Sequence, residues 1–579
     1  MGMVTLTIDG QKVEIEQGAT ILDAARKAGV NIPTLCYLKD INEIGACRIC
    51  VVEVKGAKSL QAACVAPVAN NMEVRTNTPE IRQTRRTTLE LIMSNHRQEC
   101  LTCIRNQNCE LQSLAETFGI RNIRFEGEMA RHSIDDSSPS LVRDPEKCIL
   151  CRRCVSVCEK VQTVNAIGPH DRGFDMTIAP PFDLKMSEGV CTNCGQCVLV
   201  CPVGALYEKD QVDQVWDALS DPSKHVIVQT APATRVALGE ALGMAQGSIV
   251  TGRMVSALRR LGFDKVFDTD FTADLTIMEE GHELIERINE NGTLPLITSC
   301  SPGWIKFMEH FYPDLVPNIS TCKSPQQMFG ALAKTYYAEK AGIDPKDMFV
   351  VSIMPCTAKK FEAQRPEMSS SGYADIDVVL TVRELARMIK QASLDFEGLP
   401  VEEYDAPFGI TTGAGVIFGA TGGVMEAALR TAYEVITGKT LEKIDFEGVR
   451  GLAGVKEAAV DAGGLKVKVA VAHGLGNARK VLDLVRAKKA DYHFIEIMCC
   501  PGGCIGGGGQ PIPTNTEIRE KRIRAIYEAD RRMTLRKSHE NPAVQELYKQ
   551  FLGKPLGHKS HELLHTHYTP RGEYGQVCV

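Results

Sequence analysis

At 579 residues the chain is too long for a single hydrophobic core, so we expect several domains. Its hydrophobic content of 44% and charged content of 24% are typical of a soluble globular protein, and its net charge of −6 gives no basic surface for nucleic acid. There is no run of about eighteen apolar residues and no signal-peptide pattern at the start, which predicts a cytoplasmic protein without a membrane span.

The first two predicted domains cover residues 1–78 and 79–135. In the first, alternating apolar residues predict strands near Val4–Ile8 and Lys12–Ile15 around the Asp9-Gly10 turn, followed by a helix over Ala19–Ala28. The second is polar and mostly helical from Pro79 to an irregular tail. The Ser- and Asp-rich stretch 135–140 predicts a linker.

A compact cysteine-rich domain is predicted over 136–218, and Asp217–Lys224, with its Asp-Pro pair, predicts the next boundary. Apolar runs then alternate with helical patterns, which predicts an α/β catalytic domain over 219–535. Its expected strands are Val226–Val228 and Phe349–Ile353, and its expected helices include Val255–Leu261, Leu275–Asn289 and Thr381–Ala392. A mainly helical tail over 536–579 completes a multidomain α+β and α/β chain.

Cysteine is the most informative residue type, with 22 copies in the chain. Many are separated by only two or three residues, which is too close for a general disulfide framework and suits thiolates that converge on one metal centre. Scattered buried thiols would not explain this clustering.

The first set of ligands is spaced C-x10-C-x2-C-x13-C and consists of Cys36, Cys47, Cys50 and Cys64. It resembles the [2Fe–2S] domain at the front of respiratory complex I large subunits. Gly45-Ala46 supplies flexible backbone whose amides can donate to the sulfurs. Zinc is an alternative for any four-cysteine set, but the neighbouring sets favour iron.

The second set has the spacing H-x3-C-x2-C-x5-C and consists of His96, Cys100, Cys103 and Cys109. An imidazole in place of one thiolate makes the site less negative and so tunes its potential. A lone histidine is usually a surface or core residue, but this spacing from three cysteines favours a ligand of a [4Fe–4S] cluster.

Two further sets repeat the run C-x2-C-x2-C-x3-C of two-cluster ferredoxins, in which the fourth cysteine of each run binds the other cluster. One [4Fe–4S] cluster is therefore assigned to Cys148, Cys151, Cys154 and Cys201, and the other to Cys191, Cys194, Cys197 and Cys158. Four electron carriers in one chain indicate that single electrons move over a long path.

The second half contains three motifs: Thr298–Trp304 (TSCSPGW), Met354–Glu362 (MPCTAKKFE) and Glu496–Cys504 (EIMCCPGGC), the last followed by Gly507–Pro511. They resemble the three signatures of [FeFe]-hydrogenases, and the similarity covers nearly the whole chain. The resemblance implies reversible H2 oxidation and proton reduction at an H-cluster, which joins a [4Fe–4S] cube to a diiron unit with CO, cyanide and a dithiolate amine.

The resemblance also implies roles for individual residues. Cys356, Cys500 and Cys504 match cube ligands, with Cys504 bridging to the diiron unit. Lys359 would donate to a cyanide ligand, and Met354 and Met498 would pack around the diiron unit. The Gly506–Gly509 stretch lets backbone pass close to the cofactor.

The first motif departs from the commoner family form, which has two adjacent cysteines, a proton relay and then a ligand. Here Cys300 precedes Ser301. Either Cys300 becomes the fourth ligand, or Ser301 binds as an alkoxide. We favour Cys300, because iron–sulfur centres prefer the softer thiolate, and this leaves the usual thiol relay in doubt.

The resemblance also implies a proton route through Glu280, Glu283, Arg287 and Ser320. The two glutamates lie at i and i+3 of the predicted helix and so share one face. Such a pair alone is more often a solvated helix face, and the motif match favours the proton route.

Several residues keep more than one interpretation. Cys322 and Cys499 fit small buried fillers as well as a functional role, and Cys578 is a single thiol, too few for a further cluster. A metal site among the tail histidines is less favoured than a solvated helix; these are His558, His561, His565 and His567.

Gly413–Gly415 with Gly419 lacks the spacing of a dinucleotide fingerprint, so nucleotide and flavin are expected on partner subunits. The arrangement resembles the catalytic subunit of NAD(P)-linked hydrogenases, including electron-bifurcating ones. The resemblance therefore implies a hetero-oligomer with flavin- and NAD(P)-binding and [2Fe–2S] subunits, and exchange with ferredoxin.

Three alternatives are a hydrogen sensor, a non-enzymatic iron–sulfur scaffold and a complex I-type electron-transfer subunit. A sensor would carry a signalling domain, and none is visible in this sequence. Scaffold proteins of this type lack the proton-route residues that are present here. An electron-transfer subunit would leave Cys300, Cys356, Cys500 and Cys504 unused.

Overall fold

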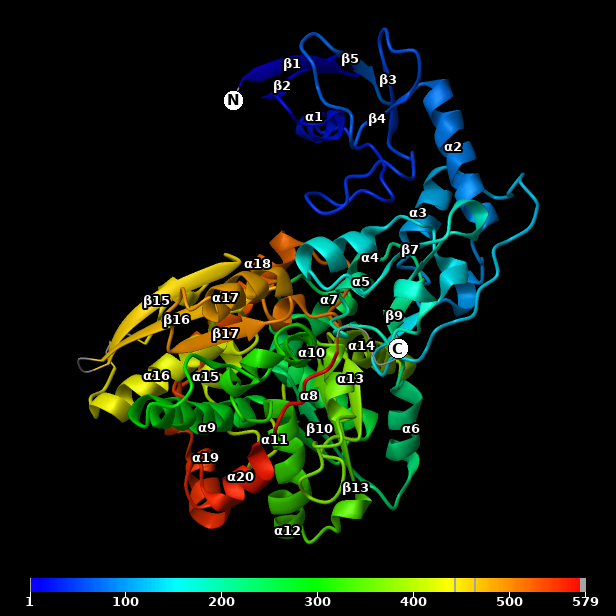
Figure 1. Cartoon of the computed structure of the whole chain (residues 1–579). Helices are drawn as coiled ribbons and strands as arrows, with labels where there is room; N and C mark the ends of the chain where they lie inside the picture. Colours follow the sequence, from blue (N-terminus) through cyan, green and yellow to red (C-terminus); the bar gives the residue numbers. More distant parts are fainter. Residues whose placement is uncertain (1, 442–443, 463–464, 573–579) are drawn as a thin grey trace.

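The computed structural model describes residues 2–441, 444–462 and 465–572. Figure 1 shows an N-terminal module standing apart from a large body, with helix α2 (Pro79–Ser94) running between them. No helix within the described ranges is both long and apolar enough to cross a membrane. The limits of the predicted domains stay predictions, and Cys578 lies outside the described residues.

The N-terminal module contains a five-stranded sheet in the order β2-β1-β5-β3-β4. The predicted hairpin is confirmed as β1 (Met3–Ile8) and β2 (Gln11–Glu16), and Asp9 and Gly10 have φ of 48° and 86°, as a tight hairpin turn requires. The predicted helix is α1 (Ile21–Lys27), which Thr20 and Asp23 close with a capping box. The other strands are β3 (Val51–Val54), β4 (Gln61–Ala62) and β5 (Glu73–Arg75).

The next region is helical, as predicted, with α2 and α3 (Glu110–Thr117). The linker predicted over 135–140 is wrong. Asp135 accepts a hydrogen bond from the backbone of Met186, and buried Ser138 donates to Asn193, so alternate parts of this polar stretch are anchored to the body. Beside it, β6 (Leu141–Arg143) pairs with β9 (Leu206–Glu208) around the two short helices of the cysteine runs, α4 (Arg153–Ser156) and α5 (Gln196–Val200).

Two four-stranded sheets form the centre of the body. The first, with all its strands parallel, has the order β11-β10-β13-β14, with bounds Lys265–Asp268, His225–Thr230, Met348–Met354 and Val378–Thr381. The second has the order β12-β17-β16-β15, with bounds Leu296–Ile297, Phe494–Met498, Leu465–His473 and Val455–Ala462. β12, β17 and β16 are parallel, and β15 is antiparallel to β16. The predicted alternation of strands and helices is therefore confirmed.

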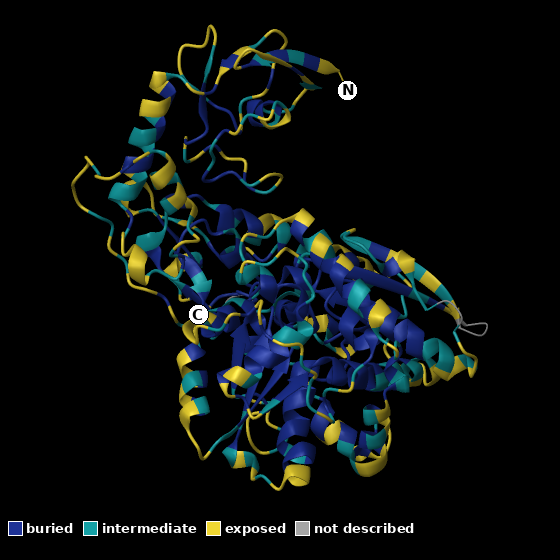
Figure 2. Ribbon diagram, turned by 180° about the vertical axis from the view of Figure 1, so that it is seen from behind, coloured by how far each residue is buried: buried dark blue, intermediate teal, exposed yellow. Residues whose placement is uncertain are grey.

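Helices cover these sheets, and the interior of the body is continuously buried (Figure 2). The predicted helices are α8 (Thr251–Leu261), α9 (Asp270–Asn289) and α14 (Val382–Gln391). Helix α9 is buried over most of its first fifteen residues, including its carboxylates. It therefore lies inside the protein and not on a solvated face.

The C-terminal segment is helical, with α18 (Thr516–Arg532), α19 (Pro542–Leu547) and α20 (His558–Leu564). After α20 the chain runs beside residues 321–323, where the Lys323 backbone donates to Leu564 O and the Thr566 backbone donates to Thr321 O, each at 2.8 Å. His558, His561 and His567 are exposed, as expected of a solvated segment. That expectation is wrong for His565. This residue directly follows helix α20 and is only 9% exposed.

Candidate active site

A cavity of about 80 Å³ lies where strands of both sheets end. Its walls come from the residues just after β10, β13 and β17, together with the loop that follows β12. Ligands of open parallel sheets bind at the carboxyl ends of the strands, because the loops there converge. This arrangement brings together all three cysteine motifs, which lie far apart in the sequence.

The cavity is lined by thiols and apolar side chains. The sequence-predicted residues on its wall are Cys300, Ser301, Met354, Cys356, Lys359, Met498, Cys500 and Cys504. Cys499, whose role was left open, also reaches it. A dry pocket with several convergent soft donors fits an iron–sulfur cofactor.

Glycines bring backbone close to the cavity. Gly503 has φ of 87°, and a Cβ there would lie 2.7 Å from the backbone nitrogen of Thr421. A Cβ on Gly508 would lie 2.3 Å from the carbonyl oxygen of Cys194. Both distances are shorter than atoms tolerate, so only glycine lets these segments pass.

The thiols are costly to ionise in this environment. Burial raises the pKa of Cys356 well above its usual range, with Cys500 and Cys504 adding to the effect, and burial raises the pKa of Cys504 to about 12. A bound cationic metal reverses this balance, because it stabilises thiolates directly. The donor set therefore fits a metal centre better than free thiols.

Lys359 is held at the cavity by two contacts. Its Nζ donates to Glu362 at 2.8 Å and to the carbonyl oxygen of Cys300 at 3.2 Å. Glu362 was not assigned a role from the sequence, although it lies three residues after Lys359 on helix α13 (Ala358–Ala363), the spacing of a helical ion pair.

Cys300 and Ser301 have different surroundings. Burial raises the pKa of the Cys300 thiol well above its usual range, and Glu280 and Cys504 add to this, whereas Lys359 opposes it. The hydroxyl of Ser301 accepts a hydrogen bond from the backbone N–H of Cys499 at 3.1 Å. The Cys300 thiol is thus within electrostatic range of a cavity thiol and of Glu280 on helix α9.

Hydrogen bonds join three of the four predicted proton-route residues, and Glu280 lies within electrostatic range of Glu283. Burial and the nearby Glu283 raise the pKa of Glu280 to about 8, while the nearby hydroxyl of Ser320 opposes the shift. Ser320 donates to Glu283 Oε2 at 2.9 Å, and Arg287 donates to Glu283 Oε1 at 2.6 Å. Arg287 is partly exposed, so the hydrogen-bonded part of the series reaches towards solvent.

The two ferredoxin-type sets line separate small cavities, in the grouping expected from the sequence. One is lined by Cys148, Cys151, Cys154 and Cys201, and the other by Cys158, Cys191, Cys194 and Cys197. The fourth cysteine of each run therefore lies with the other run, which suits two cubane clusters.

In the first N-terminal set the cysteines lie together in pairs, and in the second the histidine has a distinctive environment. Cys50 Sγ lies 3.3 Å from Cys64 Sγ, and the backbone N–H of Cys47 donates to Cys36 Sγ at 3.5 Å. Burial lowers the pKa of His96 to about 4, so its ring is neutral, and its buried Nδ1 has no partner among the described residues. A neutral imidazole with an unpartnered nitrogen fits a metal ligand.

Direct contacts join the sets to one another and to the main cavity. Asn42 donates to the carbonyl oxygens of Cys36 and Cys151 at 2.7 and 2.9 Å. At the other end, Gln162 donates to Cys499 O at 3.1 Å, and a hydrogen bond from Cys499 lowers the pKa of Cys194 to about 6. The last ferredoxin set therefore contacts the wall of the main cavity.

Five family descriptions match successive parts of the chain. "Iron only hydrogenase large subunit, C-terminal domain" matches residues 224–508, and "Iron hydrogenase small subunit" matches 516–571. Ahead of them are a 2Fe-2S iron-sulfur cluster binding domain (2–79), the NADH-ubiquinone oxidoreductase-G iron-sulfur binding region (85–124) and a 4Fe-4S dicluster domain (135–205).

Two similar proteins match this chain over nearly its whole length. NADP-reducing hydrogenase subunit HndD of Solidesulfovibrio fructosivorans is 54% identical over 99% of this chain and 100% of its own. Iron hydrogenase 1 of Clostridium pasteurianum is 43% identical over 98% of this chain and 100% of its own. Among solved structures, a variant of [FeFe]-hydrogenase HydA1 from Chlamydomonas reinhardtii is 48% identical with a TM-score of 0.57, covering 62% of this chain and 99% of that one.

Proposed function

Because this chain belongs to the iron-only hydrogenase family, we propose that it is the catalytic subunit of an [FeFe]-hydrogenase that interconverts H2 with protons and electrons. The observation that carries this proposal is the thiol-lined cavity. Cys499 on its wall accepts a hydrogen bond from Gln162 beside the last ferredoxin set, and Cys300 on its wall is within electrostatic range of Glu280. A redox reaction of H2 needs both an electron path and a proton path at one centre.

Cys300, Cys356, Cys500 and Cys504 would hold the cube of the H-cluster. When bound, this cofactor supplies the heterolytic cleavage and formation of H2. Lys359 places a positive charge at the cavity, where it can orient an anionic ligand, and Met354 and Met498 keep water out.

Glu280, Ser320, Glu283 and Arg287 move protons between the cavity and the surface. A carboxyl group whose pKa lies near 8 can both accept and release a proton under neutral conditions. Ser320 can pass a proton on because its hydroxyl both donates and accepts.

The accessory sets would hold one [2Fe–2S] and three [4Fe–4S] clusters. The Asn42 contacts bring the N-terminal set to the first ferredoxin set. The histidine set reaches the same place, because the backbone of Glu110, just after Cys109, donates to Pro202 O at 3.0 Å. Electrons would thus enter at two points, converge, and continue to the main cavity through the second ferredoxin set.

Replacing His96 by Ala should change one [4Fe–4S] signal and leave the [2Fe–2S] signal intact, since the imidazole is assigned to one cluster only. Electron paramagnetic resonance of the reduced protein measures this, with His132→Ala, a histidine outside the ligand sets, as the control. The unsubstituted protein should contain about 20 iron atoms per chain. An unchanged [4Fe–4S] spectrum in the His96 variant would contradict the ligand assignment.

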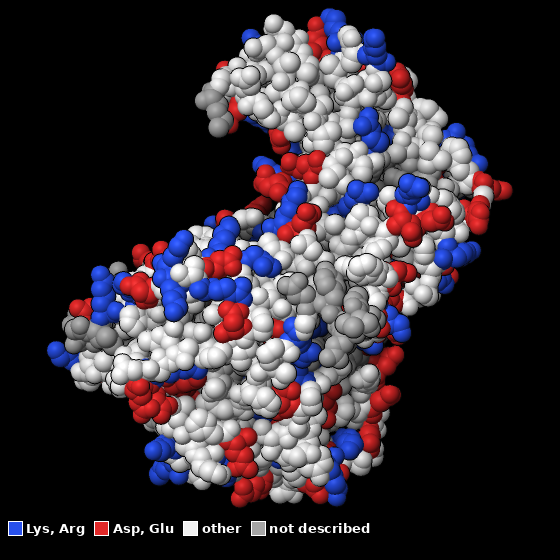
Figure 3. All heavy atoms as spheres, in the orientation of Figure 1, with Lys and Arg blue, Asp and Glu red and all other residues white. Residues whose placement is uncertain are grey.

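Partner subunits would bind at the N-terminal module, which stands apart from the body that holds the catalytic cavity (Figure 1). Positive and negative side chains are interspersed over the face shown in Figure 3, with no extended region of one sign on it. We propose flavin- and NAD(P)-binding and [2Fe–2S] subunits as these partners in a hetero-oligomer, and ferredoxin as a second carrier if the complex is electron-bifurcating. The similar HndD is described as a subunit of an NADP-reducing enzyme. A cytoplasmic, anaerobic setting suits 22 cysteines that must stay reduced.

The test is made on matured protein purified without oxygen. It should evolve H2 from a reduced viologen, show infrared bands of iron-bound CO and cyanide, and fail to reduce NAD or NADP without partners. Loss of the bands after confirmed maturation would overturn the catalytic assignment. Reduction of NADP by the single chain would overturn the partner assignment.

A further inference from the structure

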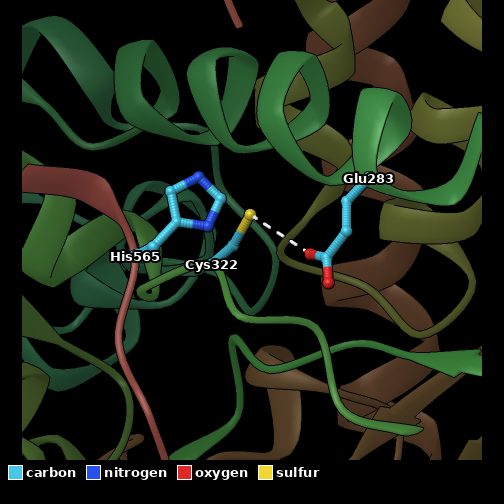
Figure 4. Close-up of side chains that lie close together, drawn as sticks. All are labelled: Glu283, Cys322 and His565. Atoms are coloured by element: carbon cyan, nitrogen blue, oxygen red, sulfur yellow. Dashed lines mark hydrogen bonds between the residues drawn. The ribbon is translucent and has the colours of Figure 1, made fainter. Parts of the chain in front are cut away.

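Three side chains from distant parts of the chain meet beside the proton route: Glu283 of helix α9, Cys322, and His565 of the C-terminal segment. Figure 4 shows the sulfur of Cys322 between the imidazole and the carboxylate. One ligand atom of each residue lies within 4.8 Å of the others, and Cys322 Sγ is 4.0 Å from Glu283 Oε2. All three side chains are buried, so the cluster is shielded from bulk water.

Backbone pairing fixes His565 at this position. Cys322 and His565 form an antiparallel bridge, and hydrogen bonds on either side join Lys323 to Leu564 and Thr566 to Thr321. The imidazole therefore has little freedom to leave the cluster. A residue of the segment that matches the small-subunit family thus reaches a catalytic element of the large-subunit segment.

Hydrogen bonds define which imidazole nitrogen is basic. Nε2 lies 3.2 Å from Glu279 Oε2, and Nδ1 lies 2.7 Å from Thr321 Oγ1. Burial alone would raise the pKa of Glu279, but hydrogen bonds from His565, Tyr548 and the Leu556 backbone lower it, so this group is a carboxylate. A carboxylate accepts the Nε2 proton, which leaves Nδ1 as the basic nitrogen.

A metal ion fits this cluster poorly. Both ring nitrogens of His565 already have partners, and both oxygens of Glu283 are engaged with Arg287 and Ser320. A cation would have to break several buried hydrogen bonds to bind. The same contacts suit proton transfer, because each can be reversed without moving a heavy atom far.

We propose that His565 is a proton-carrying residue and opens a second branch of the proton route, from Glu283 through Cys322 and His565 to exposed His561. The branch rests on the proposed hydrogenase function, since it serves the same protons. The rings of His565 and His561 are 4.4 Å apart, and His561 is exposed on helix α20. This second branch would run beside the exit at Arg287.

Each transfer conserves protons and charge. In the outward direction, protonated Glu283 gives its proton to Cys322 as the thiol gives one to Nδ1 of His565. A carboxylate and an imidazolium result, and the thiol is restored. The imidazolium returns to neutral when its Nδ1 proton passes to His561 and then to water, which restores the starting tautomer, and H2 evolution uses the reverse order.

The groups around His565 come from every element packed against it. They are Glu279 and Glu283 of α9, with Arg287 paired to Glu283, Cys322 and Thr321 of the preceding loop, Tyr548 before α20, His561 of α20, and Tyr568 after it. The nearby Lys323 is directed away, to Asp375 at 2.6 Å. Glu279, which is held as a carboxylate, is bonded to His565 Nε2 and can balance the charge of a transient imidazolium.

The test compares His565→Gln with the matched control His567→Gln, which changes an exposed histidine of the same segment. In matured protein, His565→Gln should lower H2 evolution by about threefold to tenfold and change the shape of its pH profile, because the Arg287 exit still works. Added imidazole should restore part of the rate in His565→Ala. His567→Gln should match the parent.

His561→Gln supplies a second measurement that leaves the buried contacts intact, and it should change the pH profile in the same direction as His565→Gln. Parental pH profiles in both variants, together with no response of His565→Ala to imidazole, would overturn the branch. The infrared bands and the turnover of the parent protein measure the hydrogenase function independently of the branch. A failure of the branch is therefore distinct from a failure of the proposed function.

Discussion

Replacing Glu280 by Gln should lower H2 evolution by about a hundredfold or more, because the amide occupies the same space but cannot release a proton. Glu280 is buried, and its Oε1 has no hydrogen-bond partner among the described residues, so no bonded neighbour of Oε1 offers a substitute path for its proton. Turnover with reduced viologen measures the effect. The matched control is Glu286→Gln, which changes an exposed glutamate of the same helix and should keep parental activity.

The pH dependence should identify the same group. The fold raises the pKa of Glu280 from 4.5 to about 8, chiefly by burial, so the group is protonated in the native state up to that pH. H2 evolution that depends on it should fall as pH rises through about 8. The unfolded chain releases this proton earlier, so its contribution lowers stability progressively from about pH 4.5 to 8.

In Glu280→Gln that pH-dependent loss is removed, and the melting temperature relative to the parent should be higher at pH 8 than at pH 5. Scanning calorimetry measures the difference. Parental turnover with intact CO and cyanide bands in the variant would remove Glu280 from the proton route.

Replacing Cys300 by Ala should abolish the cube and with it all turnover, whereas Ser301→Ala should keep the cube assembled. The reason is that a thiolate is the softer donor, and the hydroxyl of Ser301 is already engaged by the backbone of Cys499. Electron paramagnetic resonance and infrared spectroscopy must decide, because loss of either a ligand or a relay would stop turnover.

The reverse result has an equally clear meaning. A cube that is lost with Ser301 and kept without Cys300 would make Ser301 the ligand. Cys300, which is within electrostatic range of Glu280, would then be the proton relay. The two variants are controls for each other, since they change adjacent residues of one loop.

Ligand spacing was the part of the site that the sequence predicted best. Iron–sulfur clusters are bound by short, regular runs, so the two ferredoxin-type sets could be grouped by their spacing alone, and the grouping agrees with the two small cavities. The strands and helices of the body were also predictable, because buried parallel strands are short apolar runs between helical patterns.

Polar segments were harder to interpret. The stretch from Asp135 to Ser140 has the composition of a linker, yet the side chains of Asp135 and Ser138 are hydrogen-bonded in the interior. In the sequence, the residues around His565 are typical of a solvated tail, yet backbone pairing with Cys322 buries this histidine. Composition reports the average preference of a residue, whereas burial depends on which distant segment supplies its partners.

The sequence by itself therefore determined the family, the spacing of the cysteine sets and the order of the iron–sulfur domains, because these depend on residue type and local spacing. Only the tertiary structure decided that Glu280 is desolvated, that Glu362 holds Lys359, and that Cys499 lies between the last ferredoxin set and the cavity. Each of these depends on the electric field and packing from segments far apart in the chain, which no local pattern encodes.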